Sequence, residues 1–180
     1  MNIIYLLLHH GADPNVFAEE NTTPLHDAIF DKHAPAQVVE MLLAKNADPT
    51  VRNIHLITPL HIAATWGLTD VVRLLLAKNS SYEYVNATER NGETALHFAA
   101  GNDKLMTYQQ LYYISDRTVT SNDGVTAARL AFNEFGYDSV IIKWLLNGTP
   151  VKHKNKTVDY SQRLYEALGE GLGPKKLDFS

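Results

Sequence analysis

The sequence predicts an all-α solenoid built from stacked helix–turn–helix units, and two repeated motifs support this prediction. Thr23-Pro24-Leu25-His26 recurs as Thr58-Pro59-Leu60-His61 and Thr94-Ala95-Leu96-His97, with a weaker copy at Thr126 and a period of about 35 residues. A second motif keeps the same period, because residues 6–15 match residues 41–50 and residues 74–79 follow. Two motifs with one period indicate a tandem array in which each unit packs against its neighbours.

The first motif has the chemistry of a helix start. The Thr side chain can accept a hydrogen bond from an amide of the first turn, and Pro at the next position loses nothing because that amide would be unpaired. In the third unit the pattern predicts an inner helix over residues 59–66 that Gly67 ends, and an outer helix over residues 70–77. Asn91-Gly92 and Asp123-Gly124 are typical of tight turns before the next Thr.

The remaining elements follow this plan with local departures. Residues 2–9 are predicted as an outer helix, and the other inner helices begin near Thr23, Thr94 and Thr126. Insertions at residues 33–36, 80–85 and 133–138 are predicted to lengthen loops, which solenoids tolerate. Residues 104–114 form the fourth outer helix, where Tyr108, Tyr112 and Tyr113 predict looser packing or hydroxyl partners. In the last unit Ala127, Ala128 and Arg129 replace Pro, Leu and His, which suits a terminal cap.

These elements divide the chain into a repeat domain and a tail. The predicted units are a partial one at 1–17 and further ones at 18–52, 53–88, 89–120 and 121–148. Residues 149–180 form a tail with one short amphipathic helix predicted at 159–168. The apolar residues Ile3, Ile4, Leu6 and Leu7 have no preceding unit to cover them. We therefore expect either a fragment of a longer array or an N-terminal edge that docks onto another chain, including self-association.

The motif Thr-Pro-Leu-His-x-Ala at this period is typical of ankyrin repeats, and the chain resembles that family from its first residues to about Gly148. The resemblance implies that the turns before each Thr project as finger loops. It also implies that His26, His61 and His97 hydrogen-bond the loop and the Thr of the adjoining unit. Because they lie about one repeat apart, these three imidazoles cannot converge on one metal ion. His9 and His10 are expected to be exposed residues near a helix end, so no metal and no cofactor is predicted.

Composition and missing motifs exclude several classes of function. Sixteen Lys and Arg against twenty Asp and Glu give a net charge of -4, which disfavours general nucleic-acid binding. The absence of Cys excludes a disulfide framework, a thiolate zinc site and a Cys nucleophile. No apolar stretch approaches the roughly 18 residues of a membrane-spanning helix, and the start is not a convincing signal peptide. We expect a cytoplasmic or nuclear protein that is not an enzyme and has no small-molecule substrate.

The resemblance implies that a protein or peptide partner binds the concave side through exposed inner-helix positions and finger loops. By their register after the repeat Thr, the inner-helix positions are Phe30, Asp31, Trp66 and Asn102. The finger positions are Phe17, Glu19, Glu20, Arg52, Ile54, His55, Glu89 and Arg90. Trp66 is the strongest anchor candidate, together with Phe30, because the other face of its helix is already occupied by apolar residues. The alternative is that Trp66 only covers the finger of a neighbouring unit.

Two classes of function follow from this sequence. The first is a non-enzymatic interaction module that holds a protein or peptide in its concave groove. The second is the repeat portion of a larger enzyme or signalling protein, such as a ubiquitin-ligase adaptor, a kinase or an ankyrin-plus-LEM nuclease, whose catalysis is encoded outside this sequence.

Overall fold

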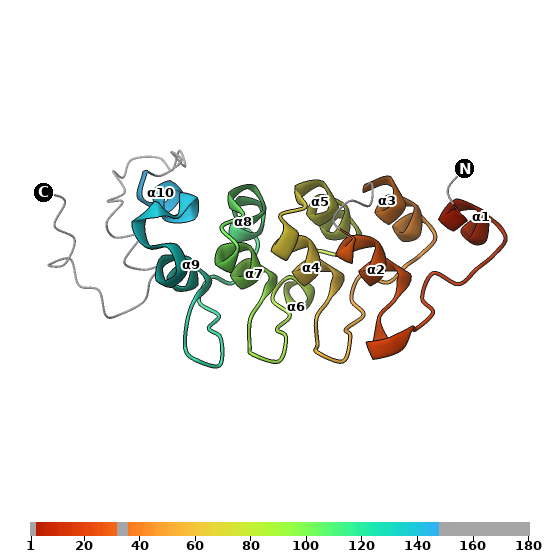
Figure 1. The fold of residues 1–180 in the computed structure, drawn as a ribbon, viewed down its shortest axis with the longest axis horizontal. Helices are drawn as coiled ribbons and strands as arrows, with labels where there is room; N and C mark the ends of the chain where they lie inside the picture. Colours follow the sequence, from red (N-terminus) through yellow and green to blue (C-terminus); the bar gives the residue numbers. More distant parts are fainter. Residues whose placement is uncertain (1–2, 32–35, 148–180) are drawn as a thin grey trace, which may run out of the picture.

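The computed structural model describes residues 3–31 and 36–147, with side chains from residue 6 to residue 146 outside the gap. Two layers of helices run along one axis (Figure 1). The inner layer holds α2 (Pro24–Phe30), α4 (Pro59–Trp66), α7 (Ala95–Gly101) and α9 (Ala127–Phe135). The outer layer holds α1 (Ile3–His9), α3 (Ala36–Ala44), α5 (Thr69–Lys78), α8 (Leu105–Tyr112) and α10 (Val140–Asn147).

Contacts between helices follow the order of the repeats. Each inner helix packs against the next inner helix, each outer helix packs against the next outer helix, and the two helices of a unit pack against one another. The described residues contain no β-strand, only isolated bridges at the bases of two fingers, Thr88 with Thr94 and Thr120 with Thr126. The predicted all-α solenoid is therefore confirmed. Within the described ranges, no helix has both the length and the apolar character needed to cross a membrane.

The helix boundaries have local causes. Thr23, Thr58 and Thr94 have extended backbone dihedrals and begin α2, α4 and α7, with the His three residues later completing a capping box. Gly67 ends α4 in the left-handed conformation at φ 70°, as the sequence predicts. Gly67 also lets the next unit approach, because a Cβ there would lie 2.9 Å from Cδ of Lys104.

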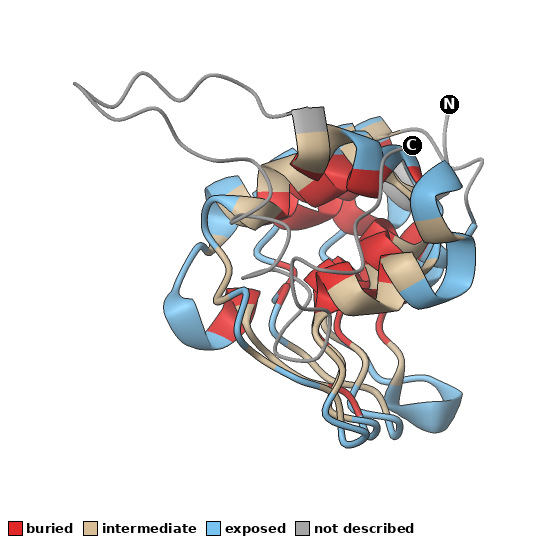
Figure 2. Ribbon diagram, turned by 90° about the vertical axis from the view of Figure 1, so that its left-hand side faces the viewer, coloured by how far each residue is buried: buried red, intermediate tan, exposed pale blue. Residues whose placement is uncertain are grey.

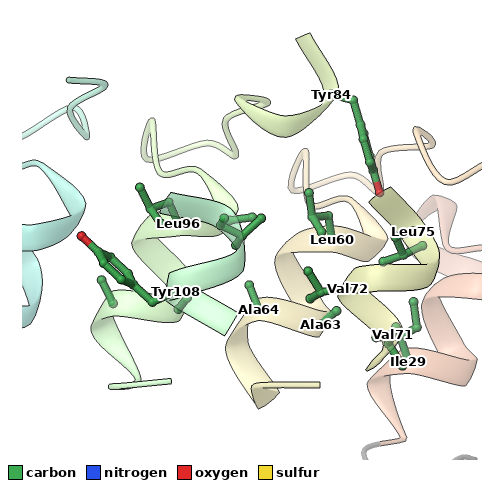
Figure 3. Packing of buried hydrophobic residues seen from close by; sticks show 14 of the residues in the cluster. Ile29, Leu60, Ala63, Ala64, Val71, Val72, Leu75, Tyr84, Leu96 and Tyr108 are labelled. Carbon is green, nitrogen blue, oxygen red and sulfur yellow. The ribbon is translucent and has the colours of Figure 1, made fainter. Parts of the chain in front are cut away.

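The core lies between the two layers of helices, while the finger loops are largely intermediate or exposed (Figure 2). Small residues allow the inner helices to approach closely, since Ala63, Ala64, Ala99 and Ala100 are fully buried. Larger side chains fill the space toward the outer layer, and Leu60, Leu75 and Leu96 are seen between neighbouring helices in Figure 3. The stack thus has one continuous core assembled from contacts between adjacent units.

Several sequence predictions are wrong in detail. Residues 80–85 do not only lengthen a loop: they contain the one-turn helix α6 (Tyr82–Val85), which buries Tyr84 and Val85. Residues 133–138 are not a plain loop either, because α9 continues to Phe135 and a 3₁₀ turn, η2 (Gly136–Asp138), follows. A second 3₁₀ turn, η1 (Glu19–Asn21), lies in the first finger. Chain that was expected to be irregular is therefore partly helical.

Packing around the tyrosines of α8 is also tighter than predicted. Tyr108 is only 1 % exposed, and its ring lies 6.2 Å from that of Trp144 in an edge-to-face arrangement. Tyr112 contacts the same tryptophan at 5.2 Å, and the guanidinium of Arg117 lies 4.7 Å from the Tyr112 ring centroid. The prediction of looser packing is therefore wrong for Tyr108 and Tyr112, which extend the core into the last unit, whereas Tyr113 is 60 % exposed.

Some expectations concern residues outside the described ranges. These are the insertion at residues 33–35, the tail at 149–180 with its predicted helix, and the side chains of Ile3 and Ile4. Within the described part of the first helix, Leu8 is buried and Leu7 is 54 % exposed.

Candidate functional site

A repeated histidine contact joins each unit to the next. In α4 the backbone N–H of Thr58 donates to Nδ1 of His61 at 3.2 Å, and Nε2 of His61 lies 3.0 Å from the carbonyl oxygen of Ala87. Because Nδ1 accepts a backbone hydrogen bond, Nε2 carries the proton and donates to that carbonyl. His26 and His97 repeat this arrangement toward the carbonyls of Ile57 and Val125. The predicted loop contact is confirmed, but the Thr that each ring contacts belongs to its own unit.

Burial keeps these three imidazoles neutral, because its effect on the pKa exceeds that of their hydrogen bonds to backbone carbonyls. Burial lowers the pKa of His61 from 6.5 to about 4, against the opposing effect of its hydrogen bond with Ala87. Burial also lowers the pKa of His26 and of His97. They are structural residues that connect units. In the described part of the chain, no group of His, Asp and Glu side chains is arranged to hold a metal ion.

The fingers share one turn that is closed by a side-chain oxygen. Asn53 Oδ1 accepts from the amides of His55 and Ile57, and Glu89 Oε1 accepts from those of Asn91 and Glu93. Glu89 is consequently buried, at 7 % exposure. Its carboxylate stabilises the finger and is not presented at the tip.

Adjacent fingers are also hydrogen-bonded to one another. The guanidinium of Arg52 donates to the carbonyl of Thr88 in the next finger, and that of Arg90 donates to the carbonyl of Ile54 at 2.6 Å. The amide of Ile54 in turn donates to the carbonyl of Glu20 at 2.9 Å. Both predicted arginines therefore hold neighbouring fingers in register, which orients the exposed side chains of the tips.

Leu56 is an exposed finger residue that the sequence reasoning missed. Its backbone φ is 63°, in the left-handed region, at the register position two residues before the repeat Thr where later fingers have Gly92 and Gly124. The side chain is 41 % exposed, and Ile54 beside it is 45 % exposed. The signal was present in the sequence, because the aligned finger turns read Leu, Gly and Gly at one position. A leucine there costs backbone strain without burying its side chain.

The structure brings the two main anchor candidates together. Phe30 at the end of α2 is 68 % exposed and Trp66 at the end of α4 is 39 % exposed. Their ring centroids lie 6.5 Å apart with an interplanar angle of 81°, an edge-to-face contact between adjacent units. Asp31 and Asn102 are exposed at the ends of α2 and α7. Trp66 therefore does more than cover a neighbouring finger, because its ring contacts Phe30 of the preceding inner helix.

The remaining predicted residues lie on the fingers. Phe17 is 62 % exposed in the first finger, with Glu19 and Glu20 in η1, and His55 is exposed in the second. The described residues thus present apolar and aromatic side chains both at the ends of two inner helices and on two fingers.

Comparisons with known proteins agree with this architecture. Family models described as ankyrin repeats match residues 7–63 and 37–123. E3 ubiquitin-protein ligase KEG of Arabidopsis thaliana is 31% identical over 105 residues, covering 58% of this chain and 6% of the relative. B-cell lymphoma 3 protein homolog of Mus musculus is 29% identical over 131 residues, covering 69% of this chain and 29% of the relative. Ankyrin repeat and LEM domain-containing protein 1 of Homo sapiens is 36% identical over 71 residues, covering 39% of this chain and 12% of the relative.

This chain spans less than a third of the length of each of these relatives, so the similarity concerns their repeat regions. The two family models together run from residue 7 to residue 123, across the repeated Thr-Pro-Leu-His motifs and the helix pairs that they begin. The chain belongs to the ankyrin-repeat family, whose repeats form protein–protein interaction modules.

Proposed function

We propose that this protein binds a protein or peptide partner on its concave surface, with Phe30 and Trp66 as the central contact. The observation that carries the proposal is the exposed edge-to-face pair that these two rings form between adjacent inner helices. Large aromatic side chains dominate binding energy when a partner covers them. The exposed finger residues Phe17, Ile54 and His55 provide a second contact along the same face of the solenoid.

The rigidity of the surface supports this proposal. Hydrogen bonds from Arg52 and Arg90 hold adjacent fingers in register, and the histidine contacts join each inner helix to the loop that leads into the next unit. A surface whose side chains are already positioned loses less conformational entropy when a partner binds. The module itself has no catalytic role in this proposal.

Alanine variants test the contact directly. Phe30→Ala and Trp66→Ala, expressed as the full 180-residue chain, should leave the far-ultraviolet circular dichroism nearly unchanged because both side chains are partly exposed. Each should reduce capture of partners by about tenfold or more, as expected for a central aromatic contact. Quantitative mass spectrometry of affinity captures measures this reduction.

Met106→Ala is the matched control, because Met106 is 63 % exposed but lies on the outer helix α8. It should capture the same partners as the unmodified protein. Captures that are identical for all three variants would contradict the proposed contact.

A second candidate is that the module serves a larger protein. The similar region covers 6% of a ubiquitin-protein ligase and 12% of a LEM-domain protein, so ankyrin repeats of this kind act as minor parts of longer chains. In that case the surface would bring a partner to an activity encoded elsewhere. Sequencing of the full transcript would test this, since continuous coding sequence beyond either end supports it and stop codons at both ends contradict it.

A further inference from the structure

The described part of the stack ends with the unit that contains α9, η2 and α10, at the opposite end from α1 (Figure 1). Each unit of a solenoid buries one face against the preceding unit and the other against the following one. On its preceding side, α9 packs against α7 and α10 packs against α8. No unit follows within residues 36–147, so the second face is open to water unless another segment covers it.

Arg129 provides the first sign of such a cover. It stands three residues after Thr126, where the earlier units have His26, His61 and His97, each donating to a carbonyl in the loop that leads to the following unit. Arg129 has no such loop among the described residues, yet its Nη1 atom is buried and lacks a hydrogen-bond partner there. A buried guanidinium N–H without an acceptor is costly, so an acceptor from another part of the chain is expected at this register.

A second buried donor lies on the outer helix of the same unit. Nε1 of Trp144 is buried and has no partner among the residues that the structure describes. The ring itself packs edge to face against Tyr108 and Tyr112 of α8. Both unsatisfied groups are N–H donors, so a segment that covers them must bring oxygen acceptors to this end of the stack.

Ile142 is closed to water at the same end. The buried residues of α8 and α10 have the same spacing, which places Ile142 at the register of Tyr108. Tyr108 contacts Trp144 of the following unit, whereas Ile142 is 0 % exposed although the described ranges hold no following unit. The cover therefore needs apolar side chains as well as acceptors.

The chain itself contains a segment with this chemistry. Helix α10 ends at Asn147, and residues 148–180 continue from this end of the stack. An extended chain advances about 3.3 Å per residue, so the residues before Asp159 are enough to return across a pair of helices. Leu164 and Leu168 lie one helical turn apart, the spacing of an apolar helix face. A segment attached to the same chain also has a high effective concentration at this face.

We propose that residues 149–168 cover the open face of the last unit and take the place of a following unit. Leu164 and Leu168 pack against α9 and α10, and main-chain carbonyls of the segment accept hydrogen bonds from Arg129 and Trp144. The segment then provides the cap that a solenoid needs at its end. This inference does not depend on the proposed partner contact, which lies on α2 and α4.

Tryptophan fluorescence provides the test. Trp66→Phe in the full 180-residue chain leaves Trp144 as the only tryptophan. In that background, Leu164→Asp together with Leu168→Asp should release the segment, because burying a carboxylate is costly. Acrylamide quenching of Trp144 should then increase about twofold or more, as for a side chain exposed by a local opening.

Leu172→Asp together with Leu177→Asp is the matched control, because it adds the same charges outside residues 159–168. Quenching of Trp144 should be the same as in the parent chain. Far-ultraviolet circular dichroism of both chains confirms that the repeats remain folded.

Arg129→Met tests the proposed hydrogen bond. It removes the donors and keeps an unbranched side chain, and it should raise quenching of Trp144 by less than about twofold. In the chain that carries Asp at residues 164 and 168 it should have no further effect, since the acceptor is already lost. Arg73→Met is the control, because Arg73 is exposed on the outer helix α5, and it should leave quenching unchanged.

Three results would overturn the inference. Quenching that Leu164→Asp with Leu168→Asp leaves unchanged would show that this segment does not cover the last unit. An effect of Arg129→Met that persists in that chain would show that the guanidinium is bonded elsewhere. Quenching that falls as the protein concentration rises, and that both Asp substitutions leave unaltered, would show that a second copy of the chain covers the face.

Discussion

Leu56 occupies a backbone conformation that is far easier for glycine. The left-handed region costs a leucine roughly 1–2 kcal/mol, whereas Gly92 and Gly124 adopt it at the same place in later fingers. Leu56→Gly should therefore raise the free energy of unfolding by about 0.5–1 kcal/mol, after allowance for the greater flexibility of glycine in the unfolded chain. Urea unfolding followed by circular dichroism measures the change.

The neighbouring Ile54→Gly is the control for this prediction. Ile54 is also exposed in the same finger, but its φ is not positive, so glycine brings only flexibility and should lower stability. Equal losses in both variants would show that Leu56 is not strained. If Leu56→Gly gains stability as expected and also loses partner capture, the leucine contributes to binding at a cost in stability.

For single residues, the sequence predicted which side chains are exposed better than it predicted which side chains contact one another. The register after each repeat Thr correctly identified Phe30 and Trp66 as exposed inner-helix residues. It could not show that their rings meet, because the contact depends on the spacing between two units. It also could not show that Arg52 and Arg90 are bonded to neighbouring fingers, since a mobile charged side chain and a bonded one have the same sequence.

Among the helices, α4 was predicted at its exact bounds because proline and glycine mark its two ends. The one-turn helix α6 was missed since four residues are too few for a periodic pattern, and its stability comes from burying Tyr84 and Val85. The extension of α9 to Phe135 was missed for a related reason. Phe132 contacts Tyr137 of η2 with ring centroids 5.2 Å apart, a short-range contact that forms only because η2 turns the chain back onto α9.

Helix α4 also offers a direct measure of how much one buried side chain stabilises the stack. Leu60 is fully buried, at the start of the apolar stripe that the repeat motif sets. Leu60→Ala should lower the free energy of unfolding by about 2–5 kcal/mol through lost burial and a residual cavity. Leu7→Ala, at a position that is 54 % exposed on α1, should change it by less than about 0.5 kcal/mol. Similar losses in the two variants would contradict the packing described for α4.

Across the whole molecule, three buried neutral histidines make stability depend on pH. Folding lowers their pKa values, so at these three sites the unfolded chain takes up protons more readily than the folded chain as the pH falls below about 6.5. The free energy of unfolding should therefore decrease between pH 7 and pH 5, by as much as about 1.4 kcal/mol per pH unit for each histidine. Urea midpoints measured across this range give the slope.

Substitutions assign that slope to its source. His61→Gln should make the slope shallower, because the pKa of His61 is lowered to about 4 and the folded chain keeps this ring neutral across the interval; His26 and His97 should supply the slope that remains. Leu7→Ala, at an exposed position without a titratable group, should leave the slope unchanged. Burial and the nearby Glu89 and Asp123 raise the pKa of Glu93. Protonation of Glu93 at lower pH therefore favours the folded chain and opposes the loss of stability caused by the histidines. A profile that is flat from pH 7 to pH 5 in the unmodified protein would contradict the neutral buried histidines.

The imidazole contacts also give the array a direction of assembly. Every contact runs one way, from a ring in one unit to a carbonyl just before the Thr of the next or, for His61, to Ala87 in the approach to it. Each unit of this series therefore has an imidazole donor facing the following unit and a backbone carbonyl acceptor facing the preceding one. Arg129 stands where the next histidine would be, so the series of imidazole donors at this register ends with His97. An additional repeat designed to lengthen this surface should therefore be inserted just before the unit that begins at Thr126. There its loop carbonyl can accept from His97 and its own histidine can donate to the carbonyl of Val125.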